Sequence, residues 1–380
     1  MELVAATMAS GGDAVARDPQ GKTVFVRGAL PGERVEVTIV NDRKKYAVAS
    51  VEAVIEPSPD RISPPCPEID RGCGACPWQH ISLAAQRRMK WQFVTEAIER
   101  AGVDCPIPEP PVDLAPWDFR TTINAAVDRG RAGFHQARSN RVVAVHGCLV
   151  AHPLLVELLV DVRYPGARTV LLRCGVRTGE RLAATTPTRL GLTLPADVHQ
   201  EHFHEVAADR SWRVSARSFF QSRADGADAL AALVGSAAEA LGTPSTAIDL
   251  YSGVGLFAGV LARRGWSVTA VEGSQSAVSD AEFNLRDSTA RVVRADVTAW
   301  APARADLVVA DPSRTGLGPQ GVEVVAATGA RRLILISCDA ASLGRDAGLL
   351  QAAGYNLSAV TLLDLFPHTF RVEAVTVYDR

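Results

Sequence analysis

From about residue 211 to residue 380, short apolar strands alternate with helical segments, and this rhythm constrains the fold more than any other feature of the chain. The pattern predicts strands at 247–251, 267–272, 305–310 and 332–337, and helices at 224–241 and 257–264. Strands that alternate with helices form a mostly parallel sheet, because each crossover helix carries the chain back to the same end of the sheet. Residues 211–380 are therefore predicted to form a doubly wound α/β domain.

The first 55 residues show a different pattern, in which apolar and polar positions alternate between turns that contain glycine and proline. Strands are predicted at Thr23–Arg27, Arg34–Val40 and Ala47–Ile55. Several short strands joined by such turns are typical of a small β-barrel. We therefore expect a multidomain chain that begins with a small OB-like β-barrel over residues 1–55.

The intervening residues 56–210 are predicted to form a central, mostly-β domain. An amphipathic helix is expected from Ser82 to Arg100, because apolar residues recur on one face and Gly102 follows its end. A proline-rich connector at 103–116 follows, and strands such as Thr169–Cys174 dominate up to about residue 215.

The composition is that of an ordinary soluble protein, with 47% hydrophobic and 22% charged residues and a formal net charge of −2. No apolar run reaches the roughly 20 residues that span a membrane. We expect a cytoplasmic monomer with no membrane partner. Bulk charge gives no argument for nucleic-acid binding. Residues 117–150 are locally rich in arginine, which fits either a basic binding surface or a solvated hairpin.

A glycine-containing turn follows the strand predicted at 247–251. Gly253 and Gly255 let the backbone approach a ligand at the carboxyl edge of the sheet, and Glu272 ends the next strand, where an acid can accept hydrogen bonds from ribose hydroxyls. NAD or FAD is one candidate ligand, but the third glycine of the dinucleotide fingerprint is absent, which argues against it.

A thiol and two carboxylates follow other strands of the same domain. Asp311 follows the strand 305–310, and Cys338 follows the apolar strand 332–337. Glu373 lies in the segment Phe366–Glu373 near the C-terminus. A cysteine after an apolar strand is more often core packing than a nucleophile. Beside a carboxylate and a nucleotide-type pocket, however, it indicates covalent catalysis with a general base.

Four of the seven cysteines are candidate metal ligands. Cys66, Cys73 and Cys76 lie close together in a loop, and Cys148 follows much later. In a cytosolic enzyme such a set indicates metal or iron–sulfur ligation rather than disulfides. Four thiolates suit an iron–sulfur cluster or zinc equally by count. The remaining alternative is a set of reduced cysteines with no ligand.

Together these segments resemble the S-adenosylmethionine-dependent RNA uridine-C5 methyltransferases. The run Asp249–Gly255 is similar to methyltransferase motif I, and Phe219–Gln221 to the Phe-x-Gln motif of the family. Ser337–Asp346 resembles Ser-Cys-Asn-Pro-x-Thr-Leu-x-Arg-Asp, with Asp339, Ala340 and Ser342 as departures. The segment Phe366–Glu373 keeps the pattern Phe-Pro-x-Thr-x-x-Val-Glu.

The resemblance implies a role for each candidate residue. Cys338 would be the nucleophile that adds to C6 of the base, and Glu373 the general base that removes the C5 proton. The cofactor S-adenosylmethionine would be held by Gln221, Tyr251, Gly253, Gly255, Glu272, Asp296 and Asp311. The four clustered cysteines (Cys66, Cys73, Cys76 and Cys148) would hold a [4Fe-4S] cluster, and the C-terminal domain would be Rossmann-like.

The N-terminal barrel also carries a resemblance. Gly21–Val37 is similar to a TRAM domain, a small RNA-binding barrel, although a structural barrel that touches no RNA is the alternative. A TRAM-like barrel together with the cysteine set favours 23S rRNA as the substrate. Modification of a tRNA uridine, or non-catalytic RNA binding with a retained cofactor fold, are the other hypotheses.

Overall fold

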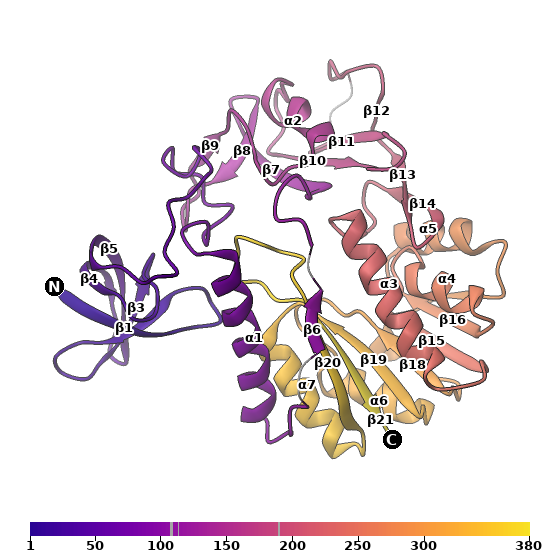
Figure 1. Ribbon diagram of the computed structural model, residues 1–380. Coiled ribbons are helices and arrows are strands. Elements are labelled where there is room, and N and C mark those ends of the chain that lie inside the picture. Colours follow the sequence, from indigo (N-terminus) through magenta and orange to yellow (C-terminus); the bar gives the residue numbers. More distant parts are fainter. Residues whose placement is uncertain (107–108, 113, 189–190) are drawn as a thin grey trace.

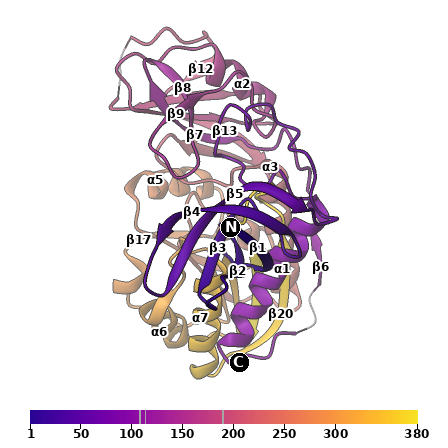
Figure 2. The same ribbon diagram turned by 90° about the vertical axis from the view of Figure 1, so that its left-hand side faces the viewer.

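The computed structural model describes residues 1–106, 109–112, 114–188 and 191–380. Residues 107, 108 and 113 of the expected connector lie outside the described residues. The barrel lies at one side of the molecule, the central sheet above, and the large α/β layer below (Figure 1). Seen from the barrel side, the barrel lies in front of the α/β domain (Figure 2). The predicted multidomain α/β architecture is confirmed.

The N-terminal barrel is closed by five strands in the order β1-β2-β3-β5-β4. The strands are β1 (Glu2–Met8), β2 (Ala14–Arg17), β3 (Thr23–Arg27), β4 (Arg34–Asp42) and β5 (Tyr46–Glu56). Alternate positions such as Val24, Val26 and Val35 are fully buried, so the period of two puts one face of each strand into the barrel interior.

The central region is a six-stranded sheet in the order β12-β11-β10-β7-β8-β9. Its strands are β7 (Thr122–Asp128), β8 (Arg131–His135), β9 (Val142–Ala144), β10 (Thr169–Cys174), β11 (Arg181–Thr186) and β12 (Val198–His199). Helix α2 (Pro153–Val160) packs on this sheet through Leu155, Leu158 and Leu159. The hairpin of β13 (His202–Ala207) and β14 (Arg210–Ser215) then leads into the α/β domain.

The C-terminal domain is built on an eight-stranded sheet in the order β17-β16-β15-β18-β19-β21-β20-β6. The strands after the hairpin are β15 (Thr246–Leu250), β16 (Ser267–Glu272), β17 (Arg291–Arg294), β18 (Leu307–Ala310), β19 (Arg332–Ser337), β20 (Asn356–Leu363) and β21 (Ala374–Asp379). The helices are α3 (Ala224–Glu239), α4 (Leu256–Arg263), α5 (Gln275–Leu285), α6 (Gly318–Thr328) and α7 (Ala340–Ala352), with a short 3-10 turn η1 (Val297–Ala299).

Strands β15 to β19 of this sheet are parallel, whereas β21 runs antiparallel to both β19 and β20. The strands β18 and β19 are buried over almost their whole length, as expected for strands covered by helices on both faces. The parallel strands therefore present their carboxyl ends at one edge, and the antiparallel β21 begins at that same edge.

Two segments expected in the central domain belong to the core of the α/β domain instead. Helix α1 (Leu83–Arg100) starts at Ser82, whose hydroxyl accepts a hydrogen bond from the amide of Ala85, and packs against α7. Strand β6 (Glu109–Val112) runs parallel to β20 as the edge strand of the large sheet. Helix α1 thus buries its apolar face on the core of the α/β domain.

Candidate active site

A cavity of about 770 Å³ lies between the central sheet and the carboxyl edge of the large sheet. Its walls combine residues from β7, from the loop before α3, from the ends of β15, β18 and β19, and from the loop before β21. Loops at the carboxyl ends of parallel strands are the usual site of ligand binding in such folds. The cavity is therefore the candidate active site.

Cys338 and Glu373 both line this cavity, although they lie far apart in the sequence. Strands β19 and β21 pair in antiparallel register, with Ser337 opposite Ala374. Cys338 follows Ser337 and Glu373 precedes Ala374, so the sheet brings them to the same end of neighbouring strands. The thiol of Cys338 is partly exposed to the cavity, while Glu373 is buried.

The surroundings of Cys338, Glu373 and Asp311 disfavour negative charge on these three side chains. Burial, together with the carboxylates of Glu373 and Asp311, raises the pKa of the Cys338 thiol to about 11, whereas Arg314 lowers it. Burial and then Asp311 raise the pKa of Glu373 well above its ordinary value. Burial likewise raises the pKa of Asp311, and the amide of Gln221, which donates a hydrogen bond to Asp311 Oδ2 at 3.2 Å, acts in the opposite direction. Strongly shifted groups gathered in one cleft are typical of catalytic sites.

The other end of the cavity is formed by the turn after β15. Tyr251 and Gly253 have positive φ angles of 60° and 55°. The amide of Gly253 donates a hydrogen bond to Glu272 Oε2 at 2.9 Å, and the amide of Ser274 donates to Glu272 Oε1 at 2.7 Å. These bonds fix the Glu272 carboxylate at the cavity wall, where its remaining lone pairs can accept hydrogen bonds from ligand hydroxyls.

Two buried polar atoms next to this turn have no hydrogen-bond partner among the described residues, namely Asp249 Oδ1 and Ser252 Oγ. The second carboxylate oxygen of Asp249 accepts a hydrogen bond from the amide of Ala258 at 2.8 Å. An unpaired buried polar atom is costly, so partners for these two atoms are expected from a ligand or from water. The polar turn, Glu272 and these two atoms fit a nucleoside-type cofactor such as S-adenosylmethionine.

Five of the seven expected cofactor residues line the cavity: Gln221, Tyr251, Gly253, Glu272 and Asp311. Gly255 and Asp296 do not. Gly255 begins α4 with φ 95°, and a Cβ there would lie 2.8 Å from Leu285 Cδ1, so this glycine serves the turn and its packing. Asp296 is exposed and caps the turn η1 by accepting a hydrogen bond from the amide of Thr298 at 2.8 Å.

Several cavity residues were not expected from the sequence. Strand β7 contributes Thr122 and Asn124, with Arg120 just before it. Arg314 and Arg371 line the same space, and the ring of Phe219 is 64% exposed there. Cationic and aromatic side chains around an acidic centre suit a nucleotide, whose phosphates and bases they contact. The arginine-rich stretch 117–150 was the only signal in the sequence for the β7 wall.

Cys66, Cys73, Cys76 and Cys148 line one small cavity, to which Phe134 of β8 also contributes. The four thiols are free, and burial raises the pKa values of Cys73, Cys76 and Cys148. The cysteine loop is fixed against the end of β8, where Gly74 donates its amide hydrogen bond to the carbonyl of His135 at 3.1 Å. Within the described ranges, no three His, Cys, Asp or Glu side chains are grouped closely enough to hold a metal ion.

Comparison with known proteins decides the family. The TRAM domain family matches residues 3–51, the segment that forms the closed barrel. The chain is 34% identical to an uncharacterised RNA methyltransferase of Streptomyces coelicolor, over all of this chain and 92% of the relative. It is 31% identical to the 23S rRNA (uracil(1939)-C(5))-methyltransferase of Aeromonas hydrophila, over 95% of this chain and 92% of that one. The chain belongs to the RNA (uracil-C5) methyltransferase family.

The fold agrees with this assignment. A solved structure of the tRNA (uracil-54, C5)-methyltransferase of Pyrococcus abyssi with S-adenosyl-L-homocysteine matches all of both chains, with a TM-score of 0.77 and 22% identity. The predicted family membership and enzyme class are therefore confirmed. Among the described residues, no helix has the length and apolar character needed to cross a membrane.

Proposed function

We propose that this RNA methyltransferase transfers a methyl group to C5 of a uridine through a covalent adduct, with Cys338 as nucleophile and Glu373 as general base. The observation that carries the proposal is the position of both side chains in one cavity, at the adjacent ends of β19 and β21. Binding RNA requires neither a buried carboxylate nor a thiol in that place. This argues against a non-catalytic RNA-binding protein.

The reaction needs both groups, because C5 of uracil is a weak nucleophile. The Cys338 thiolate adds to C6, and the electrons of the C5–C6 double bond move to give an enolate whose C5 can accept the methyl group. Glu373 then takes the C5 proton, the electron pair reforms the double bond, and the C6–S bond breaks to release the thiolate. Bound S-adenosylmethionine supplies an electrophilic methyl group on a positively charged sulfur.

The cofactor end of the cavity would be formed by Gln221, Tyr251, Gly253, Glu272 and Asp311. Glu272 would accept hydrogen bonds from ribose hydroxyls, and Gly253 leaves the backbone accessible because only Phe219 O, at 3.9 Å, lies near the position of a Cβ. Gly255 and Asp296 support this end indirectly, by shaping the turn after β15 and capping the turn after β17.

We also propose that the four cysteines hold a [4Fe-4S] cluster of structural role. They surround one cavity from two segments, the loop 66–76 and the loop before α2. Four thiolates match the ligand count of such a cluster, and they match that of a zinc ion equally.

We propose 23S rRNA as the substrate, because a relative that is 31% identical over nearly the whole chain is a 23S rRNA methyltransferase. A tRNA is the second candidate, because the Pyrococcus abyssi enzyme of similar fold is a tRNA methyltransferase. The similarity of this chain to that enzyme, however, extends only to the fold. Unmodified transcripts of both RNAs, incubated with methyl-labelled S-adenosylmethionine and digested to nucleosides, test the proposal. Label in 5-methyluridine from the rRNA is expected. Label in a different nucleoside would contradict the chemistry, and label from the tRNA alone would reverse the choice of substrate.

A further inference from the structure

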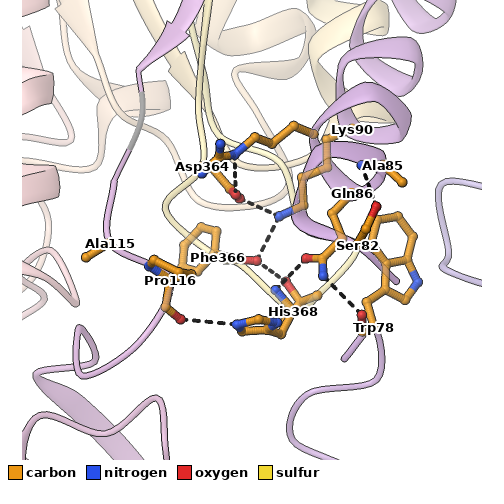
Figure 3. Close-up of polar contacts among 12 residues, drawn as sticks. Trp78, Ser82, Ala85, Gln86, Lys90, Ala115, Pro116, Asp364, Phe366 and His368 are labelled. Carbon is orange, nitrogen blue, oxygen red and sulfur yellow. Dashed lines mark hydrogen bonds and ion pairs between the residues drawn. The ribbon is translucent and has the colours of Figure 1, made fainter. Parts of the chain in front are cut away.

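A buried lysine on α1, Lys90, holds the loop that follows β20 and leads to Glu373 (Figure 3). Lys90 Nζ donates to Asp364 Oδ1 at 2.7 Å and to the carbonyl oxygen of Phe366 at 2.8 Å. Both charged side chains are only 1% exposed. The backbone of the loop is thereby tied, at a residue that lines the candidate active site, to a helix outside that site.

A second side chain of α1 holds the same loop. Gln86 is completely buried, and both ends of its side-chain amide form hydrogen bonds. Nε2 donates to the carbonyls of Trp78 and Ile81, and Oε1 accepts a hydrogen bond from the backbone amide of His368 at 2.7 Å. The carbonyl of His368 in turn accepts from the amide of Trp78 at 2.9 Å. His368 has a positive φ of 64°, so these bonds fix a turn that its backbone disfavours.

Stability alone is a weak reason for such a lysine. Burial lowers the pKa of Lys90, and desolvation of an ion pair offsets most of its attraction, so an apolar pair of similar size often stabilises a fold equally well. An apolar side chain at position 90, however, could not donate to the Phe366 carbonyl. The bond to that carbonyl is what distinguishes the lysine from an apolar residue.

We infer that Lys90 is a positioning residue for the methyl-transfer reaction. It acts through Phe366 by fixing the part of the loop that lines the candidate active site. The inference rests on the proposed covalent mechanism, because this part of the loop matters only if the target base is held against Cys338. Cofactor binding should not depend on Lys90, since Tyr251, Gly253 and Glu272 lie on other elements.

The test uses the full-length enzyme and RNA with 5-fluorouridine at the target position, and it measures the single-turnover rate of adduct formation. Lys90→Met should lower this rate about 10- to 100-fold, the usual effect of a small misplacement in an active site, and should leave S-adenosylmethionine affinity unchanged. Arg100→Met is the matched control, because it removes an exposed ion pair with Glu96 from the same helix. It should leave the rate unchanged.

Lys90→Met removes the buried charged partner of Asp364 and leaves it with Arg87, whose Nε lies 3.4 Å from Asp364 Oδ2. A second variant, Lys90→Met with Asp364→Leu, therefore separates position from stability. The Tm of this double variant should recover toward that of the wild type while the adduct rate stays low. Recovery of both would overturn the inference and make Lys90 a structural residue only. If the wild type forms no adduct at all, the covalent mechanism has failed rather than the role of Lys90.

Phe366→Ala completes the test as a double-mutant cycle. If Lys90 acts through Phe366, combining Lys90→Met with Phe366→Ala should slow adduct formation no more than the worse single variant does. Multiplied effects of the two changes would show that Lys90 acts elsewhere and would also overturn the inference.

Discussion

Ser337 and Ala374 are register partners at the end of the antiparallel pair β19–β21. The next residue outward on each strand is one of the proposed catalytic pair, Cys338 on one side and Glu373 on the other. The carbonyl of Glu373 also accepts a hydrogen bond from the amide of Leu363 on β20 at 2.9 Å. The position of the proposed base relative to the thiol is thus set by sheet pairing on both sides of β21.

Glu373→Gln should separate the two halves of the reaction. The amide has nearly the same size and can stay beside C5, but it cannot accept the proton. Methyl transfer should proceed while elimination slows by about 10²–10⁴-fold, the usual contribution of a general base. A denaturing gel should then show protein attached to ordinary RNA in a band that requires S-adenosylmethionine and Cys338. Turnover at the wild-type rate without this band would place the proton acceptor elsewhere.

The raised pKa of Cys338 predicts slow, strongly pH-dependent alkylation in the free protein. Below a pKa of about 11, the thiolate fraction and the rate of reaction with iodoacetamide should increase tenfold per pH unit from pH 7 to pH 9. Glu373→Gln removes a negative neighbour and should speed alkylation, while Arg314→Met removes a positive one and should slow it. Mass spectrometry of the Cys338 peptide gives the rates. A plateau near pH 8.5 would indicate an unperturbed thiol.

The buried carboxyl of Glu373 should also make stability depend on pH. Its folded-state pKa is raised above the unfolded value, so the fold loses stability as the pH rises from the unfolded value of about 4.3 to the folded pKa, and below the unfolded value this loss is absent. Glu373→Gln should therefore raise Tm at pH 8, by roughly 2–4 °C for each kcal/mol, and should have little effect near pH 4. A lower Tm at pH 8 would mean that the carboxylate is stabilised by a partner.

Protein purified without air should be brown and contain iron and sulfide in equal amounts, as a [4Fe-4S] cluster requires. Cys148→Ser should remove the colour and lower the thermal stability of the central region. Cys105→Ser is the matched control, because Cys105 lies outside the cavity that the four cysteines share, and it should keep both properties. Colourless protein with one bound zinc would contradict the cluster.

The helices and strands whose apolar residues recur with a clear period could be predicted from the sequence. The strands 169–174, 267–272 and 332–337 were predicted with the bounds that the structure gives. Strand β6 could not be predicted, because Glu109–Val112 carries two prolines and only an edge position tolerates them. The attachment of α1 to α7 was also missed, since an amphipathic face shows that a helix is buried but not which neighbour covers it.

The candidate active site likewise contains residues that the sequence predicted and residues that it could not. The turn after a strand pointed to Gly253, Glu272 and Asp311, because carboxyl ends of parallel strands meet at one edge. Gly255 and Asp296 were expected at the cofactor, yet a sequence does not distinguish a glycine that faces a ligand from one that a packed neighbour requires. Lys90 could not be recognised, because its partners Asp364 and Phe366 become neighbours only in the folded chain.

The most direct test of the covalent mechanism is the reaction of the enzyme with target RNA that carries 5-fluorouridine. After addition to C6 and methyl transfer, C5 holds fluorine instead of a removable proton, so elimination cannot occur and the adduct persists. The wild type should give a stable protein–RNA adduct in the presence of S-adenosylmethionine, with the bond mapped to Cys338 by mass spectrometry. Cys338→Ala should form none while still binding the cofactor. An active Cys338→Ala variant, or an adduct on another residue, would contradict the account.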